Sequence, residues 1–308
     1  MKKVNIYNLL CIFSFVILLL ILTFNVVGYI KNDRILKQDD NAARKYCDEI
    51  QIDDNVGIEK CKLINDTPIY KTDFYSMTYS VFSQGFSVFT YVIFFIITIP
   101  LVYAICNAYK NGVLTNLLTR KSYKGALSTL FLDSAKTVFI LPVIAIIAFI
   151  VCYLYTGNFD FNNALNGGFV SWRAQTMQSP VVFMLVYIFR VLCLSIGYLN
   201  IAFCVCKKQH NFFVASIVSY LIFIAIELFL ELFCNVILLQ GVFGTDIGVV
   251  LNIISVFSLF DYYGLIYSLL IPFIVVLLTL GVVVKTYWNK ESLLIECEKS
   301  MSGGTYEN

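Results

Sequence analysis

The most telling shortage in this sequence is of charged residues, which make up only 14% of its 308 positions. Soluble domains average about 25%. Hydrophobic residues supply 59%, more than a chain of this length can bury while covering itself with polar surface. The composition therefore excludes an ordinary soluble enzyme and a disordered chain, and it indicates an integral membrane protein. With a net charge of only +2, we expect no nucleic-acid partner.

Residues of the kinds that perform catalysis are also scarce. The single histidine, His210 in a KKQHN turn, cannot supply H-E-x-x-H or any other two-histidine metal site. The chain contains neither a G-x-x-x-x-G-K-[ST] phosphate loop nor a G-x-S-x-G nucleophile elbow. No long apolar run contains Asp, which excludes an intramembrane protease built on an aspartate pair. We therefore expect no catalytic residue, metal or cofactor in this chain.

Long hydrophobic runs, in contrast, are abundant. A helix needs about 20 mostly apolar residues to cross the hydrocarbon core of a membrane. The runs are continuously apolar rather than alternating, which predicts helices and not barrel strands. We expect an all-α membrane protein with six transmembrane helices, at Ile6–Ile30, Val81–Cys106, Thr137–Tyr155, Val181–Cys206, Phe212–Leu239 and Leu265–Val284.

The orientation follows from the positions of Lys and Arg, which gather on the cytoplasmic side. With the N-terminus inside, twelve of them fall in inside segments, whereas loops 156–180 and 240–264 hold only Arg173. The first run begins MKK but is too long for a signal peptide and has no cleavage site, so we interpret it as a retained anchor. We expect a multi-pass protein of the plasma membrane with both termini in the cytoplasm.

The predicted boundaries divide the chain into four parts: 1–30 with the first span, a polar outside loop over 31–80, a core over 81–290, and a cytoplasmic tail over 291–308. The outside loop holds 18 of the 42 charged residues. Cys47 and Cys61 both lie in it, and a bridge between them is left open because the redox compartment is unknown. The other cysteines, Cys204 and Cys206 among them, are expected to be free thiols.

The sequence also predicts the structure of two segments outside the six spans. The apolar run Ile247–Phe260 is too short to cross and lies between glycines, which predicts a re-entrant or interfacial hairpin before the sixth helix. The tail after Lys290 is polar, ends in SGGTYEN and is expected to be disordered.

Three ionisable residues, Arg190, Glu227 and Glu231, lie inside predicted spans, where an unpartnered charge costs roughly 2.5–3.5 kcal/mol. Counted from the inner ends of two consecutive helices, Arg190 and Glu227 both stand roughly 24 Å deep at about 1.5 Å per residue. We expect them to pair, with Glu231 one turn further out on the same helix face. Either this pair locks two helices together, or the charges line a substrate path.

The longest inside loop, 107–136, alternates leucines with basic residues. Leu114, Leu117 and Leu118 recur at helical spacing, and Arg120, Lys121 and Lys124 follow them. This pattern predicts an amphipathic helix along the inner membrane surface, broken near Ser122–Gly125. Two interpretations stay open: a helix that only contacts anionic lipid headgroups, and a docking helix for a cytoplasmic partner.

The stretch NGVLTNLLTRKSYKG in this loop resembles the corresponding loop of ABC-2-type transporter permeases. Their pattern there is close to G-(T/L)-L-x-x-L-L-(T/S)-(R/x)-P-x-S-R. The residues of this chain that fit it are Gly112, Leu114, Leu117, Leu118, Thr119, Arg120, Ser122 and Lys124. The chain departs from it in lacking an acidic residue before Gly112 and a proline before Ser122. The number of spans, the inside N-terminus and the polar loop after the first span agree with a compact bacterial member.

The resemblance implies a permease subunit of an ATP-driven exporter, which forms a homodimer or a heterodimer with a second permease. It would dock onto a separate ATP-binding subunit through Gly112–Lys124, with ATP and Mg²⁺ bound by that partner. The implied cargo is a peptide, drug or lipid-like molecule, and such small permeases often protect against antimicrobial peptides. Two alternatives stay open: an ion-coupled carrier that uses Arg190, Glu227 and Glu231, and a non-transporting membrane sensor or immunity protein.

Overall fold

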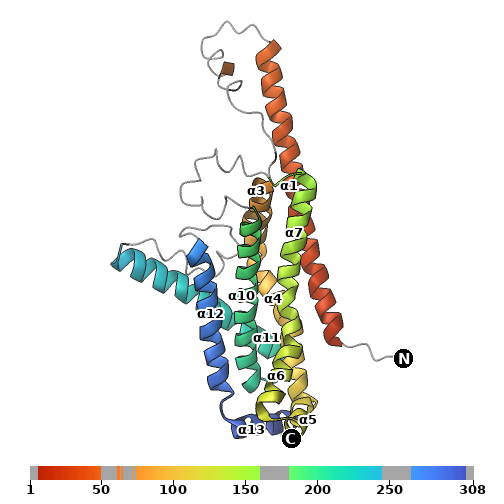
Figure 1. The fold of residues 1–308 in the computed structure, drawn as a ribbon, viewed down its shortest axis with the longest axis vertical. Helices are drawn as coiled ribbons and strands as arrows, with labels where there is room; N and C mark the ends of the chain where they lie inside the picture. The colour runs from red at the N-terminus through yellow and green to blue at the C-terminus, as the bar shows by residue number, and fades with distance from the viewer. Residues whose placement is uncertain are drawn as a thin grey trace, which may run out of the picture.

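A computed structural model describes residues 6–49, 61, 62, 64, 72, 74–159, 180–244 and 265–302. These residues form helices and connecting turns, without any strand among them. Figure 1 shows a tall bundle in which the long helices run side by side. In chain order the elements are α1 (Ile6–Glu49), α3 (Phe74–Tyr79), η1 (Ser80–Gly85), α4 (Phe86–Lys110), α5 (Val113–Arg120), α6 (Tyr123–Ser134), η2 (Ala135–Phe139), α7 (Ile140–Thr156), α10 (Pro180–Lys208), α11 (Phe212–Leu228), η3 (Phe229–Val242), α12 (Leu265–Thr286) and α13 (Lys290–Ser302).

The bundle has the dimensions of a multi-pass helical membrane protein. Within the described residues, four helical segments are long and apolar enough to cross a bilayer: Ile6–Asp48, Val92–Lys110, Tyr123–Thr156 and Val181–Lys208. The end of α12 and α13, bent by 78° to one another, count as a fifth only when taken together. The prediction that Phe212–Leu239 is one span stays a prediction, because the α-helix ends at Leu228 and π-helical turns follow it. The expected re-entrant run Ile247–Phe260 lies outside the described residues.

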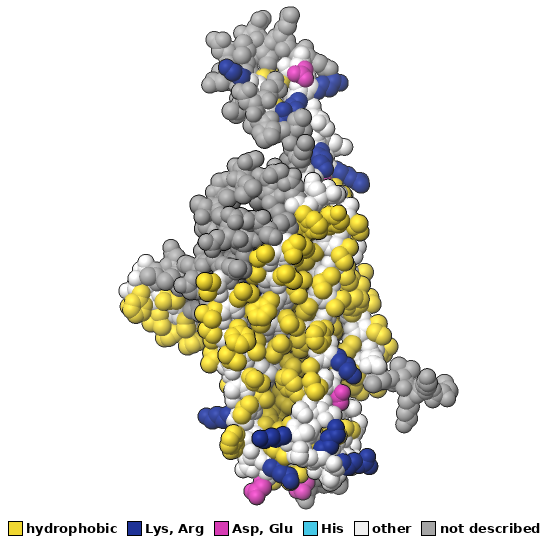
Figure 2. Space-filling model, viewed as in Figure 1, with side chains coloured by type: hydrophobic (Ala, Val, Ile, Leu, Met, Phe, Trp, Pro, Cys, Tyr) yellow, Lys and Arg dark blue, Asp and Glu magenta, His cyan; other side chains and the backbone are white. Residues whose placement is uncertain are grey.

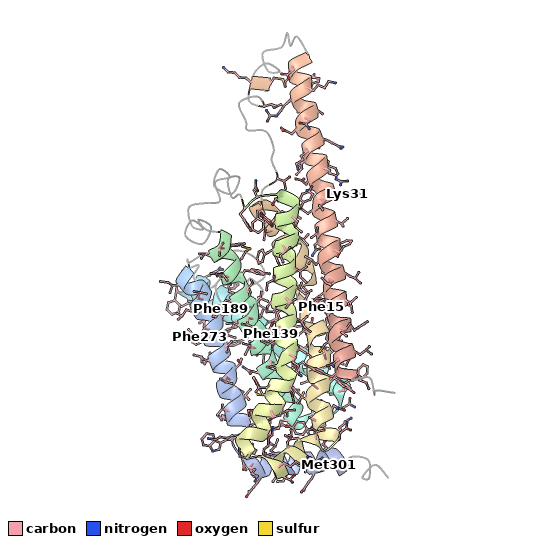
Figure 3. All side chains as sticks on the ribbon, turned by 45° about the vertical axis from the view of Figure 1, so that its right-hand side comes forward. Phe15, Lys31, Phe139, Phe189, Phe273 and Met301 are labelled. Carbon is pink, nitrogen blue, oxygen red and sulfur yellow. A yellow bond between two sulfur atoms is a disulfide. The ribbon has the colours of Figure 1, made fainter. Side chains whose placement is uncertain are left out.

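The first helix is longer than the sequence predicts, because α1 continues from the apolar run to Glu49. Residues 31–49, expected to belong to a polar loop, are therefore helical. Residues 31–49 contain neither Gly nor Pro, and two i,i+4 ion pairs support the helix, Lys37–Asp33 at 2.8 Å and Arg44–Asp40 at 3.1 Å. We call this charged part of α1 the stalk. Figure 3 labels Lys31 where the stalk leaves the bundle.

The C-terminal tail also differs from the expectation, since residues 290–302 form helix α13. The side chain of Asn289 caps the N-terminus of this helix. It accepts hydrogen bonds from the backbone N–H groups of Glu291, at 2.9 Å, and Ser292, at 3.4 Å. Leu293 and Cys297, one turn apart, are completely buried against the bundle. The prediction of a disordered tail is therefore wrong for these residues, because their apolar face has a surface to pack against.

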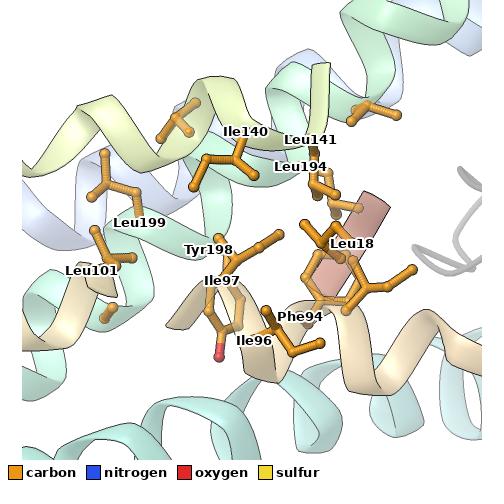
Figure 4. Packing of buried hydrophobic residues seen from close by; sticks show 14 of the residues in the cluster. Leu18, Phe94, Ile96, Ile97, Leu101, Ile140, Leu141, Leu194, Tyr198 and Leu199 are labelled. Carbon is orange, nitrogen blue, oxygen red and sulfur yellow. The ribbon is translucent and has the colours of Figure 1, made fainter. Parts of the chain in front are cut away.

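Hydrophobic side chains from all the long helices fill the centre of the bundle (Figure 4). α4 and α10 lie at its middle. Aromatic rings connect α4 to α11 and η1 to α10, with centroid distances of 4.5 Å for Phe94–Phe223 and 4.6 Å for Phe82–Tyr187. Gly197 on α10 faces α12, where a Cβ atom would lie 3.6 Å from Val275 Cγ1. This small residue lets two membrane helices approach closely.

Several polar side chains inside the bundle form hydrogen bonds between helices. The hydroxyl groups of Thr98 on α4 and Tyr198 on α10 are 2.6 Å apart. Ser14 on α1 donates to the carbonyl of Ile96 on α4 at 3.0 Å, and Asn200 on α10 donates to Thr279 on α12 at 3.0 Å. In a medium without water, such bonds fix the register of neighbouring helices.

The surface of the bundle carries a wide apolar belt with charged residues at both ends (Figure 2). We call the end that holds α5, α6 and α13 the basic end, and the opposite one the stalk end. Large apolar side chains exposed in the belt include Leu20, Phe24, Leu154, Leu185, Leu221, Phe273 and Leu278. An exposed apolar area of this size is expected for a surface that contacts lipid.

Replacing Thr98 with Val tests the contribution of the hydrogen bond between α4 and α10. We expect Thr98→Val to lower the free energy of unfolding by about 1 kcal/mol, the usual scale for such bonds between membrane helices. Thermal unfolding of the full chain in detergent measures the change. The matched control is Thr23→Val, whose exposed hydroxyl bonds only within its own helix, to the carbonyl of Leu19. An equal loss in both variants would contradict the interhelical role.

Candidate functional site

The candidate site is the surface at the basic end, where the chain turns from α4 into α5. Gly112 makes this turn with φ of 65°, a left-handed conformation that favours glycine. The preceding turn is supported by a 2.7 Å bond from the Asn111 side-chain amide to that of Asn107. α5 therefore starts at a fixed angle to a helix of the bundle.

The residues predicted for docking differ in their exposure; they are Gly112, Leu114, Leu117, Leu118, Thr119, Arg120, Lys121 and Lys124. On α5, Leu114 is completely buried, and Leu117 and Leu118 are half-buried. Thr119, Arg120, Lys121 and Lys124 are exposed, and Gly112 is half-buried at the turn. Val113, Asn116 and Arg120 are also exposed and share one face of the helix at i, i+3 and i+7. α5 is thus amphipathic, as predicted, with its leucines toward the bundle and a polar, basic face toward solvent.

The predicted break in the loop occurs at Lys121 and Ser122. Lys121 is extended, and Ser122 caps α6 by accepting a hydrogen bond from the backbone N–H of Gly125 at 3.3 Å. A Cβ at Gly125 would lie 3.1 Å from the Ser122 hydroxyl oxygen, a tight contact that a small shift of the Ser122 side chain would have to relieve. The Lys121 ammonium reaches across the break to donate to Thr129 at 2.9 Å. We call the exposed residues Val113, Asn116, Arg120, Lys121 and Lys124 the docking face.

Helix α13 supports this surface from one side and was missed by the sequence analysis. α13 contacts α4, α5 and α10, and Figure 3 labels its Met301 at the basic end of the molecule. Met301 Sδ lies 3.5 Å from the position that a Cβ at Gly112 would take. The available signals were Asn289 at a capping position and the i,i+4 spacing of Leu293 and Cys297.

Tyrosine hydroxyls tie α13 and the turn before it to the bundle. The Tyr287 hydroxyl donates to the carbonyl of Phe203 on α10 at 2.8 Å and lies 3.1 Å from the hydroxyl of Tyr109 on α4. The hydroxyl of Tyr123 on α6 donates to the backbone carbonyl of Tyr287. The ammonium of Lys207 donates to the carbonyl of Thr286. The elements that carry the docking face are therefore joined to three long helices.

His210 completes the contacts of α13 with the bundle. Its ring lies 4.8 Å from the ring of Tyr109, and its Nε2 is 3.6 Å from a carboxylate oxygen of Glu296 on α13. Burial lowers the pKa of His210 below its usual 6.5, and the nearby Glu296 only partly opposes this. The sequence indicates only that His210 lies in a turn, because its partners Tyr109 and Glu296 are distant in the chain.

Of the three predicted intramembrane charges, the structure describes the side chain of Arg190 alone. Arg190 is buried on α10, and α10 and α11 contact one another, as expected for consecutive antiparallel helices. Glu227 lies in α11 and Glu231 in η3, but their side chains are outside the part of the chain that the structure describes. The expected pair of Arg190 with Glu227 stays a prediction.

At the stalk end, a buried carboxylate and a disulfide stabilise the C-terminal part of α1. The Asp33 side chain is fully buried and accepts hydrogen bonds from Lys37 at 2.8 Å, Thr72 at 2.6 Å and Tyr155 on α7 at 2.8 Å. Cys47 and Cys61 are joined by a disulfide. The other eight cysteines are free thiols, and the described residues contain no group of three His, Cys, Asp or Glu side chains placed to hold a metal ion.

Comparison of the chain with protein-family models, curated proteins and solved structures gives no match in any of the three. The resemblance to ABC-2-type permeases therefore depends on the residues of loop 107–136 and on the arrangement of the helices. Function has to be inferred from the surfaces of the bundle.

The position of His210 generates a pH prediction. Because its pKa is lowered by folding, the unfolded chain binds a proton more readily, so stability falls as the pH drops below about 6.5. We expect His210→Gln to reduce the loss of thermal stability between pH 7.5 and 5.5. Thermal unfolding midpoints of both proteins in detergent across this range measure the difference. Parallel pH profiles for the two proteins would contradict this assignment.

Proposed function

We propose that this chain is the membrane subunit of an ATP-driven exporter of the ABC-2 type, whose docking face binds a separate ATP-binding subunit. The observation that carries the proposal is the form of α5. It is a short helix outside the apolar belt with Leu114 fully buried and with a basic, solvent-exposed face. A helix that only rests on lipid would turn its leucines toward the membrane rather than into its own bundle.

The connections of α5 suit it to transmit movement. The Gly112 turn joins it directly to α4, which lies in the centre of the bundle. α13 and the tyrosine contacts hold its other side. A force applied to Arg120 would therefore act on α4 and α10 together, and not on a loosely attached loop. ATP hydrolysis by the partner could in this way bias the bundle between two arrangements.

The remaining features of the proposal follow from this role. ATP and Mg²⁺ would be bound by the partner, and the substrate path would lie between two copies of this chain or between this chain and a related permease. The apolar belt suits a peptide, drug or lipid-like cargo that dissolves partly in the membrane. In this proposal the chain crosses six times, with α11 and η3 forming the fifth span, so both termini lie on one side. The excess of Lys and Arg in the segments on that side supports a cytoplasmic location for the termini and the docking face.

One observation favours a second candidate function, an ion-coupled carrier. Arg190 is buried in the middle part of α10, where a charge is costly and therefore commonly functional. A carrier of this kind would move solute without a partner ATPase. Reconstitution of the purified chain alone distinguishes the two: uptake driven by an ion gradient supports the carrier and contradicts the exporter.

Substitution of the docking face tests the exporter directly. We expect Arg120→Ala to weaken the stimulation that this chain exerts on the ATPase activity of the co-purified ATP-binding subunit. The expected reduction is about tenfold, the effect of removing an interface residue worth about 1.4 kcal/mol. Leu118→Ala should reduce it as well, because it loosens α5 on the bundle. Lys208→Ala is the matched control, since Lys208 is an exposed basic residue outside the docking face at the same end. The proposal fails if all three variants stimulate equally, or if no ATP-binding protein co-purifies in mild detergent.

Labelling of intact cells tests the orientation. We expect a membrane-impermeant maleimide to modify Arg34→Cys on the stalk in intact cells, and Lys124→Cys only after the cells are opened. Both positions are exposed, so protection reflects the membrane and not burial. The unsubstituted chain gives the background from its native thiols. Labelling of Lys124→Cys in intact cells would place the docking face outside and overturn the proposed function.

A further inference from the structure

Two free thiols from different helices meet at the basic end of the bundle. Cys106 lies near the end of α4 and Cys206 near the end of α10, and their sulfur atoms are 3.8 Å apart. Both side chains are buried, with 2% and 0% of the residue exposed. A disulfide requires the sulfurs to approach to about 2.05 Å. The remaining movement is less than about 2 Å, which rotation of the two side chains can supply in part.

We infer that Cys106 and Cys206 form a reversible dithiol–disulfide site that is oxidised by a small peroxide. The pair is distinctive among the eight free thiols, all of which lie in the described part of the chain. Within that part, no second pair of free sulfurs is in contact. This inference stands independently of the proposed exporter function, because it depends only on the geometry of α4 and α10.

The surroundings of the pair determine which oxidant can reach it. The Cys106 sulfur also contacts the carbonyl of Gln209 in the turn between α10 and α11, at 3.7 Å. The next residue, His210, lies against Tyr109 and Glu296 of α13. The turn and α13 therefore cover the sulfurs on the solvent side. Hydrogen peroxide, which is about as small as water and uncharged, passes such a cover more readily than a bulky or charged disulfide does.

The reaction is a two-electron oxidation of the pair. One sulfur, as thiolate, attacks an oxygen of hydrogen peroxide and the O–O bond breaks, which gives a sulfenic acid and, after protonation of the leaving oxygen, water. The second sulfur then attacks the sulfenic sulfur, so that an S–S bond forms and the S–O bond breaks with loss of a second water. Two thiols lose two electrons and two protons, and the peroxide becomes two waters. A dithiol reductant reverses the change.

The bond would join two central helices close to the surface described above. Cys106 is one turn before Lys110, where α4 ends ahead of Gly112 and α5. A covalent link from α4 to α10 at this level would prevent their inner ends from moving apart. If the chain works as proposed, the oxidised form would bind the ATP-binding subunit and fail to respond to it.

The test uses the full-length chain in native membrane vesicles. The vesicles are treated with hydrogen peroxide, the protein is denatured without reductant, and the free thiols are alkylated and counted by mass spectrometry. We expect the count to fall from eight to six, with a linked peptide pair containing Cys106 and Cys206. Dithiothreitol applied to the vesicles should abolish the Cys106–Cys206 linked peptide and return these two thiols to the alkylated set, with the peptides of Cys47 and Cys61 scored separately. The Cys47–Cys61 bridge, present before treatment, serves as an internal reference.

Matched variants separate pairing from general oxidation. Cys193→Ser removes a buried thiol elsewhere on α10, and peroxide should lower its count of free thiols from seven to five. In Cys106→Ser and Cys206→Ser the count should stay at seven after the same treatment. Unfolding midpoints equal to that of the parent confirm that each variant is folded. The inference is overturned if the parent forms no Cys106–Cys206 link, or if Cys204 takes the place of Cys206. A missing link leaves the proposed function unaffected, since ATPase stimulation is measured on the reduced protein.

Discussion

The structure depends on one constraint: inside an apolar belt, a polar group without a partner in the protein is costly. α4 and α10 meet this constraint at the centre of the bundle, where Thr98 and Tyr198 are hydrogen bonded at 2.6 Å. Ser14 attaches α1 to α4, and Asn200 attaches α12 to α10. Lipid tails cannot hydrogen bond to these groups. The bonds between helices therefore select one register for helices whose apolar surfaces would otherwise pack in many ways.

The elements at the two ends of the belt are stabilised in different ways. The stalk continues beyond the bundle as a helix because its charges pair at i,i+4 and Asp33 accepts hydrogen bonds from three side chains. At the basic end the short helices α5 and α13 are held by buried leucines and by tyrosine hydroxyls. The first arrangement gives a projecting rod, and the second a compact surface firmly attached to α4 and α10. It is this difference that makes the basic end the better candidate for transmitting force.

The sequence predicted the parts of the fold that depend on local pattern. Continuous apolar runs indicated helices such as α10 and α12, and the spacing of Leu114 and Leu118 indicated the amphipathic α5. It failed where distant contacts decide: α13 forms on a surface built by other helices, and the stalk is helical although its composition is that of a polar loop. The contacts of His210 with Tyr109 and Glu296, and of Cys106 with Cys206, join residues about 80 to 100 positions apart, and no spacing rule reveals them.

The unbroken course of α1 has a geometrical consequence for its outer tip. Cys47 lies fourteen residues beyond Asp33 on a continuous helix, so at about 1.5 Å per residue the disulfide stands roughly 21 Å above the point where the rod is fastened to α7. Lipid headgroups extend only about 5–8 Å beyond the hydrocarbon on each side. The continuous helix thus holds the cystine at a fixed distance from the Asp33 attachment that exceeds the depth of a headgroup layer.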